Sequence, residues 1–78
     1  MNKLELKEAT KEYVVYFYRP EGRGTCGEIR MNIGDDEAAI VSHSDADNSG
    51  QYAFKAAIAV KECVNRRNLP MEFTQAWV

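Results

Sequence analysis

The strongest helix signal in the chain reads Ser49-Gly-Gln-Tyr-Ala-Phe-Lys-Ala-Ala-Ile-Ala-Val-Lys-Glu-Cys-Val-Asn-Arg-Arg67. At about 100° per residue, one face of this helix collects small or apolar side chains, namely Tyr52, Ala53, Ala56, Ala57, Val60, Cys63 and Val64. Because most of these side chains are small, the helix can pack closely on a sheet. Phe54 and Ile58 are four residues apart, so they contact each other, and they fall outside this face. The stretch therefore predicts a helix with one core face and an apolar pair on its outer side.

Four stretches around this helix have the composition or the alternation of β-strands. They cover residues 13–18, 28–33, 38–42 and 71–78. Proline and glycine between the first strands predict turns at 19–24 and 34–37. The order strand-strand-strand-helix-strand predicts an α+β domain over residues 13–78. We expect a four-stranded mixed sheet with the helix packed on one face and the last strand beside the first.

Alternation along each strand assigns its side chains to two faces of the sheet. The face under the helix is expected to carry Tyr13, Val15, Phe17, Ile29, Met31 and Ile33, and the open face Val14, Tyr16, Tyr18, Glu28, Arg30 and Asn32.

Residues 1–12 carry a mixed signal. Leu4 and Leu6 alternate as in a strand, whereas Lys3, Lys7 and Lys11 would share one face of a helix. For this segment we expect an N-terminal arm or a short helix.

The start of the long helix has two candidate caps. Asn48 can cap it with Gln51 as its partner, or Ser44 can do so one turn earlier with Asp47. The helix is expected to end near Asn68, a residue that tolerates the left-handed conformation.

Composition points to a small acidic protein. The chain has 78 residues, of which 45% are hydrophobic and 28% charged, and its net charge is -2. A domain of this size has too little core for a deep substrate cleft, and its charge does not favour binding to phosphate backbones. The sequence contains neither the apolar core of a signal peptide nor a run that could span a membrane. We expect a cytoplasmic location.

The two cysteines are predicted to be free thiols. Cys63 belongs to the inner face of the helix, whereas Cys26 shares strand parity with outward-facing residues. Two cysteines and the single histidine, His43, lack the spacing of a metal site. No cofactor, metal or catalytic residue is therefore expected, and we expect the protein not to be an enzyme.

Acidic side chains gather in two clusters on either side of residues 38–42. They are Asp35, Asp36 and Glu37 before this strand, and Asp45 and Asp47 after it. No Lys or Arg occurs between Met31 and Phe54. If the strand is an edge, these charges can block aggregation, or they can dock on a basic groove of a partner. The candidate partner-binding residues are Phe54, Ile58, Asp35, Asp36, Glu37, Asp45 and Asp47.

The loop from Asp45 to Gly50 resembles the front half of an EF-hand calcium loop. Position twelve of such a loop is a bidentate glutamate, and Ala56 occupies it here. We therefore interpret the loop as a polar strand-to-helix connection that does not bind calcium.

An alternative site combines aromatic and basic residues that we expect on the open face and its first loop. It consists of Tyr16, Tyr18, Arg19, Arg23 and Arg30. Aromatic rings with arginines can stack on the bases of single-stranded nucleic acid. Glu21 and Glu28 dilute the positive charge of this patch.

The pattern over 13–78 resembles that of small phage-encoded inhibitors, notably some anti-CRISPR proteins. The matching features are the acidic turn Gly34-Asp-Asp-Glu37, the acidic loop from Asp45 to Asp47, and the helix from Ser49. The resemblance implies an inhibitor that occludes a nuclease or its nucleic-acid path. It transfers no functional residue, because such inhibitors share no diagnostic motif.

The sequence thus favours a small non-enzymatic protein-binding module that acts on a larger protein partner. Two alternatives stay open: a small nucleic-acid-binding domain that uses the Tyr/Arg patch, and a homodimeric structural or adaptor domain whose outer apolar pair serves self-association.

Overall fold

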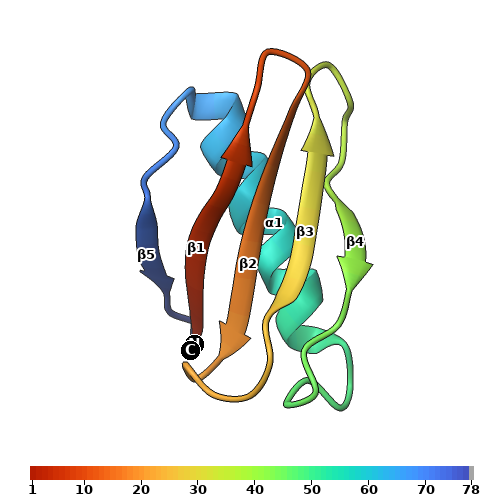
Figure 1. The fold of residues 1–78 in the computed structure, drawn as a ribbon, viewed down its shortest axis with the longest axis vertical. Helices are drawn as coiled ribbons and strands as arrows, with labels where there is room; N and C mark the ends of the chain where they lie inside the picture. The colour runs from red at the N-terminus through yellow and green to blue at the C-terminus, as the bar shows by residue number, and fades with distance from the viewer. Residues whose placement is uncertain (78) are drawn as a thin grey trace.

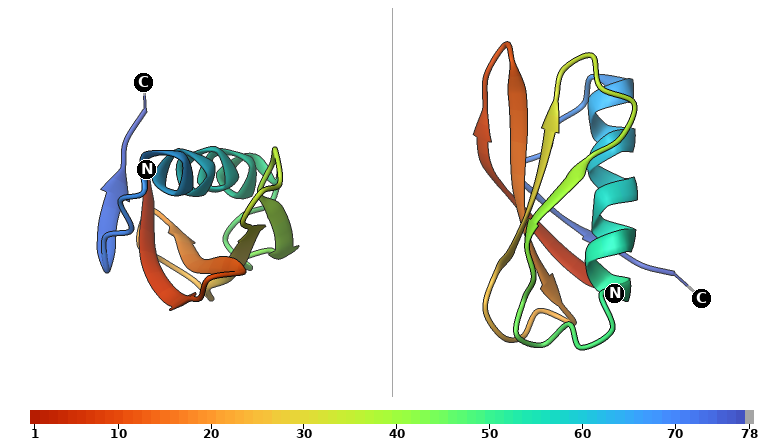
Figure 2. Two further views of the ribbon diagram at one scale, coloured as in Figure 1. Left: turned by 90° about the horizontal axis from the view of Figure 1, so that it is seen from above. Right: turned by 90° about the vertical axis from the view of Figure 1, so that its right-hand side faces the viewer.

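The computed structural model describes residues 1–77, and Val78, the last residue of the expected strand 71–78, lies outside the described residues. Residues 1–77 form the elements β1 (Asn2–Ala9), β2 (Tyr13–Pro20), β3 (Gly27–Asn32), β4 (Ala39–Ser42), α1 (Gln51–Arg66) and β5 (Glu72–Gln75). The strands make one sheet in the order β4-β3-β2-β1-β5 (Figure 1). Helix α1 covers a single face of that sheet (Figure 2). The α+β class and the helix on one face are confirmed.

The expectation of an arm or short helix at residues 1–12 is wrong, because these residues contain β1. This strand lies between β2 and β5, and Leu4 is fully buried in the core. Lys3 and Lys7 lie on the opposite, exposed side of the strand. Residues four apart share a face in a strand as well as in a helix, so the lysine spacing could not separate the two structures.

The insertion of β1 also changes the sheet from mixed to antiparallel. We expected the last strand beside 13–18, but β5 pairs with β1 instead. The pairs β1–β2, β1–β5, β2–β3 and β3–β4 are all antiparallel. The described sheet therefore has five strands rather than four. Strands β1–β4 form a meander, and β5 pairs with the outer side of β1.

The predicted faces of β2 are inverted. Tyr16 pairs with Ile29 and Val14 with Met31, and paired residues of antiparallel strands share a face. Ile29 and Met31 are buried, as expected, so Val14, Tyr16 and Tyr18 lie with them in the core. Tyr13 and Phe17 point to the other face. Because β2 is apolar at nearly every position, alternation of polarity could not assign its faces.

Two other predictions about faces have different outcomes. Ile33 lies beyond the end of β3, on the predicted helix side, where it lines a hollow with Val14 and Val64, but it is exposed rather than covered by the helix. The inner face of α1 is confirmed, since Ala53, Ala56 and Val60 are fully buried. These small side chains bring the helix close to the sheet.

The two core tyrosines each have a partner for the phenol. Tyr16 donates to the carbonyl oxygen of Pro70 at 2.6 Å, and Tyr18 donates to Oδ2 of Asp47 at 2.8 Å. Burial raises the pKa of both phenols to about 12. Each hydrogen bond compensates for the burial of a hydroxyl group and ties β2 to a loop at one end of the helix.

Candidate protein-binding surface

The outer side of α1 carries the apolar pair that the helical phase predicts. Phe54 is 61% exposed and Ile58 is 44% exposed. Two contacts show that the adjoining side of the helix, which carries Gly50 and Lys61, faces β4. Lys61 Nζ lies 2.9 Å from Oε1 of Glu37, in the turn before β4, and Gly50 lies against the ring of His43, just after β4. Phe54 and Ile58 lie between these two points on the helix.

Strand β4 supplies a third apolar side chain to this flank. Ile40 pairs with the buried Ile29, so it lies on the helix side of the sheet, where it is 40% exposed. A register shift between Glu28 and Ile29 marks a bulge near Val41, a common feature of sheet edges. Ile40, Phe54 and Ile58 are called the apolar strip below.

The turn before β4 adds negative charge to the apolar strip. Asp35, Asp36 and Glu37 are exposed, and the ion pair of Glu37 with Lys61 holds the turn beside the helix, one turn beyond Ile58. Within residues 1–77, neither Asp35 nor Asp36 forms an ion pair. The structure thus brings the first acidic cluster and the apolar pair of α1 to one surface.

Asp47 has a structural role and does not belong to this surface, contrary to its prediction as a partner-binding residue. Its side chain is fully buried. Oδ1 accepts a hydrogen bond from the backbone N–H of Tyr52 at 3.2 Å, and Oδ2 accepts one from the N–H of Ala53 at 2.9 Å. Tyr18 donates to Oδ2 as well. Buried among these donors, the carboxylate is inaccessible to a partner.

These contacts also set the charge state of Asp47. Burial alone would raise the pKa of its carboxyl group, but the hydrogen bonds from Tyr18, Ala53 and Tyr52 outweigh it, and the pKa is lowered. His43 Nδ1 lies 3.6 Å from Oδ2 and adds to this effect. Asp47 is therefore an ionised acceptor for N–H groups in the first helical turn. The N-cap position itself is Gly50, so neither Asn48 nor Ser44 caps the helix as expected.

Asp45 is exposed, but its carboxylate already accepts a hydrogen bond from within the protein. Its Oδ1 accepts a hydrogen bond from the N–H of Thr25 at 2.8 Å, and its own N–H donates to Oγ1 of Thr25 at 3.0 Å. Gly24, with φ of 76°, permits this approach, because a Cβ there would overlap the Asp45 carboxylate. The pair joins the β2–β3 loop to the loop after β4.

The loop that resembles an EF-hand uses its carboxylates for these internal bonds. Among the residues that the structure describes, no group of three or more His, Cys, Asp or Glu side chains is placed to hold a metal ion. The two described cysteines, Cys26 and Cys63, are free thiols.

The Tyr/Arg patch is not assembled as predicted. Tyr16 and Tyr18 are fully buried, so neither ring can stack on a base. Arg19 Nε donates to Sγ of Cys26 at 3.2 Å, and Arg30 lies 3.9 Å above the ring of Tyr13. Arg23 is exposed in the loop after β2. Inverting the faces of β2 removes the aromatic platform on which this alternative was based.

A groove that the sequence did not reveal lies between the second half of α1 and β5. It has a volume of about 350 Å³ and is lined by Ala59, Glu62, Cys63, Arg66, Asn68, Pro70, Phe73, Thr74, Gln75 and Ala76. Burial raises the pKa of the Cys63 thiol, which keeps it protonated and weakly nucleophilic. The groove forms because β5 docks on β1, a pairing that no local pattern indicates.

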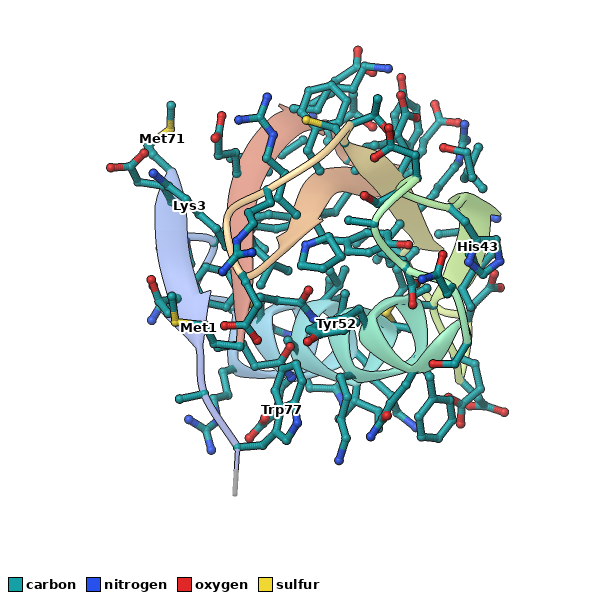
Figure 3. The ribbon with its side chains drawn as sticks, turned by 90° about the horizontal axis from the view of Figure 1, so that it is seen from below. Met1, Lys3, His43, Tyr52, Met71 and Trp77 are labelled. Carbon is teal, nitrogen blue, oxygen red and sulfur yellow. The ribbon has the colours of Figure 1, made fainter. Side chains whose placement is uncertain are left out.

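Figure 3 shows how the two sides of the molecule differ. His43 lies beside β4, whereas Met71 and Lys3 lie by β5 and Tyr52 packs near Trp77. The described residues include no helix long and apolar enough to cross a membrane. Comparison of the chain with protein-family models, with curated proteins and with solved structures finds no match.

Proposed function

We propose that the chain is a small non-enzymatic module that binds a larger protein through the apolar strip and the acidic turn beside it. The observation that carries this proposal is the exposure of Phe54 and Ile58 on α1, with Ile40 also exposed on β4, a strand that contacts this helix. In a domain with so little apolar material to spare, clustered apolar exposure is typical of an interaction surface.

The chemistry of the described polar groups supports binding rather than catalysis. The carboxylate of Asp47 already accepts hydrogen bonds from the first turn of the helix and from Tyr18. The pKa of the Cys63 thiol is raised by burial. Each of these three groups has a structural explanation.

The charge of the surface narrows the kind of partner. Asp35 and Asp36 lack cationic partners within residues 1–77, so they favour a basic surface. The resemblance to small phage-encoded inhibitors points the same way, because a nuclease or a nucleic-acid-binding complex has such a surface. We therefore propose an inhibitor of the anti-CRISPR type that occludes a basic path on its partner.

The proposal is tested by affinity capture with matched variants. Phe54→Ser/Ile58→Ser removes the apolar pair, and Met71→Ser removes an exposed apolar side chain on the β5 side, where Met71 is 74% exposed. Quantitative mass spectrometry of proteins retained from a host lysate should show one or more partners that the parent and Met71→Ser retain and the double variant loses. Identical retention by all three proteins would contradict the proposal.

Self-association is the second candidate, and the same apolar strip favours it. Sedimentation analysis of the parent separates the two. A monomer at tens of micromolar protein supports a heterologous partner, whereas a dimer that Phe54→Ser/Ile58→Ser dissociates would identify a homodimeric module.

A further inference from the structure

We infer that the partner binds by strand addition: an extended segment with apolar side chains at alternate positions and basic residues at both ends pairs with the outer edge of β4. The inference rests on the proposed function and goes beyond it by naming the binding mode and the chemistry of the bound segment.

The first argument is the open edge of β4. Within the described sheet, β4 pairs with β3 on one side and lies at the end of the strand order (Figure 1). Natural edge strands are protected by short length, bulges, charged side chains or proline. Strand β4 is short and has a bulge near Val41, but its sequence Ala-Ile-Val-Ser contains neither a charged residue nor proline. Such an edge offers its backbone N–H and C=O groups to another extended chain.

The opposite edge differs in this respect. Strand β5 begins with Glu72 and continues with polar residues at alternate positions. At its end the chain turns onto the helix: Gln75 Nε2, from the last residue of β5, donates to the carbonyl oxygen of Lys55 at 2.8 Å, and Trp77 packs edge-on against Tyr52. Of the two edge strands, β4 is therefore the more open to pairing with an added strand.

The second argument is the width of the sheet under α1. A strand added at β4 would lie about 4.8 Å farther out, on the side of the helix that Phe54 borders. Its side chains on the helix side would cover Ile40 and extend towards Phe54. The exposure of Ile40 and Phe54 is thus explained if a further strand completes the sheet beside β4.

The third argument is charge. Asp35 and Asp36 lie before β4 and Asp45 lies after it, and no Lys or Arg occurs between Met31 and Phe54. In an antiparallel pair of two β4 strands, the acidic turn of one copy would meet Asp45 of the other, and like charges would repel. A segment with basic residues at both ends instead meets opposite charge at each end of β4.

The test uses a synthetic probe, the acetylated and amidated peptide Lys-Lys-Ile-Thr-Val-Thr-Ile-Lys-Lys, added to the isotope-labelled full chain. Nuclear magnetic resonance titration should show saturable shifts at Ala39–Ser42 and at the side chains of Phe54 and Ile58, with slower hydrogen exchange along β4. Methylation of alternate peptide nitrogens, which removes edge hydrogen bonds, should weaken binding roughly tenfold or more. Replacing the four lysines with glutamates should abolish binding.

Three results would overturn the inference. Binding that survives methylation of the peptide nitrogens, with shifts confined to Phe54 and Ile58, would show side-chain docking without strand addition. Failure of the basic peptide to bind at millimolar concentration, or equal binding of the acidic peptide, would reject the stated chemistry. A β4-mediated dimer of the parent would place a second copy on the edge. The first result leaves the proposed function intact, because affinity capture with the Phe54→Ser/Ile58→Ser variant tests that function separately.

Discussion

The carboxylate of Asp47 joins separate parts of the fold through one side chain. It caps the first turn of α1 at Tyr52 and Ala53, and it accepts the phenol of Tyr18 from β2. The N–H of Ser44 in turn donates to the oxygen of Tyr18 at 3.0 Å. A chain of hydrogen bonds between buried side chains therefore connects β2, the loop after β4 and the start of the helix.

Replacing Asp47 should be costly, because three donors would lose their acceptor together. For Asp47→Ala we expect a loss of about 2–3 kcal/mol in the free energy of unfolding, from a lost cap and a lost charged hydrogen bond. Asp45→Ala is the matched control and should cost about 1 kcal/mol or less, since its site is exposed. Urea denaturation of both variants checks this. Equal losses would mean that Asp47 is not the anchor of this end.

Alkaline unfolding should follow the two core tyrosines. Burial raises the pKa of Tyr16 and Tyr18 to about 12, against about 10 in an unfolded chain. The fold therefore favours the neutral phenols, and the stability that they contribute is complete below pH 10 and lost as the pH rises towards 12. Phenolate absorbance and circular dichroism, recorded during one titration, should show these phenols ionising last and together with loss of structure. Ionisation of all four tyrosines near pH 10 in a folded protein would contradict the assignment.

The two faces of helix α1 have different roles. Its inner face is built from residues such as Ala53, Ala56 and Val60 that let it approach the sheet. Its outer side exposes Phe54 and Ile58. The sequence predicted both faces because helical phase is a local property, and it placed the helix end within a residue or two of the observed left-handed cap at Arg67.

The two faces should respond differently to substitution. Phe54→Ser/Ile58→Ser should change the free energy of unfolding by about 0.5 kcal/mol or less per site, as for other exposed residues. Val60→Ala on the inner face should cost about 2 kcal/mol or more, because it removes buried methyl groups. Chemical denaturation of the two variants beside the parent gives the comparison. Severe destabilisation by the outer pair would mean that Phe54 and Ile58 belong to the core.

Strands were harder to predict than the helix, for a reason visible in β1 and β2. The faces of β2 depend on its pairing with β3, since Val14, Val15, Tyr16 and Phe17 are all apolar. Likewise, β1 becomes a strand by pairing on both sides, with β2 and with β5. Pairing is a tertiary property, and the local pattern of residues 1–12 suits a strand and a helix equally.

At the scale of the whole molecule, the sheet order decides what the surface can do. Strand β4 ends the meander and lies at one edge of the sheet, and β5, paired with β1, forms the opposite edge. The contact between Glu37 and Lys61, which joins the acidic turn to the apolar strip, spans 24 residues. The sequence therefore indicated Phe54, Ile58 and the acidic turn, but it missed Ile40, wrongly included Asp47, and could not give the arrangement of these residues.

The position of β1 inside the sheet makes a further prediction. Leu4→Ala should cost about 2–5 kcal/mol, as expected for truncation of a fully buried leucine. Lys3→Ala, its exposed neighbour in the same strand, should stay within about 0.5 kcal/mol of the parent. Thermal or urea unfolding distinguishes them. If Leu4→Ala unfolds like the parent, residues 1–12 do not form part of the core.

The pairing of β1 with β5 also has a consequence for the kinetics of folding. Asn2 Nδ2 donates to Oε1 of Gln75, 73 residues away, whereas β2 and β3 are joined by a short loop. Loop closure is costly before distant contacts form, so β5 should dock last. Trp77, the single tryptophan, packs on Tyr52 and reports this step. In stopped-flow refolding, its fluorescence should lag behind the far-ultraviolet circular dichroism, and during that lag β1 forms a second unpaired edge of the meander in addition to β4.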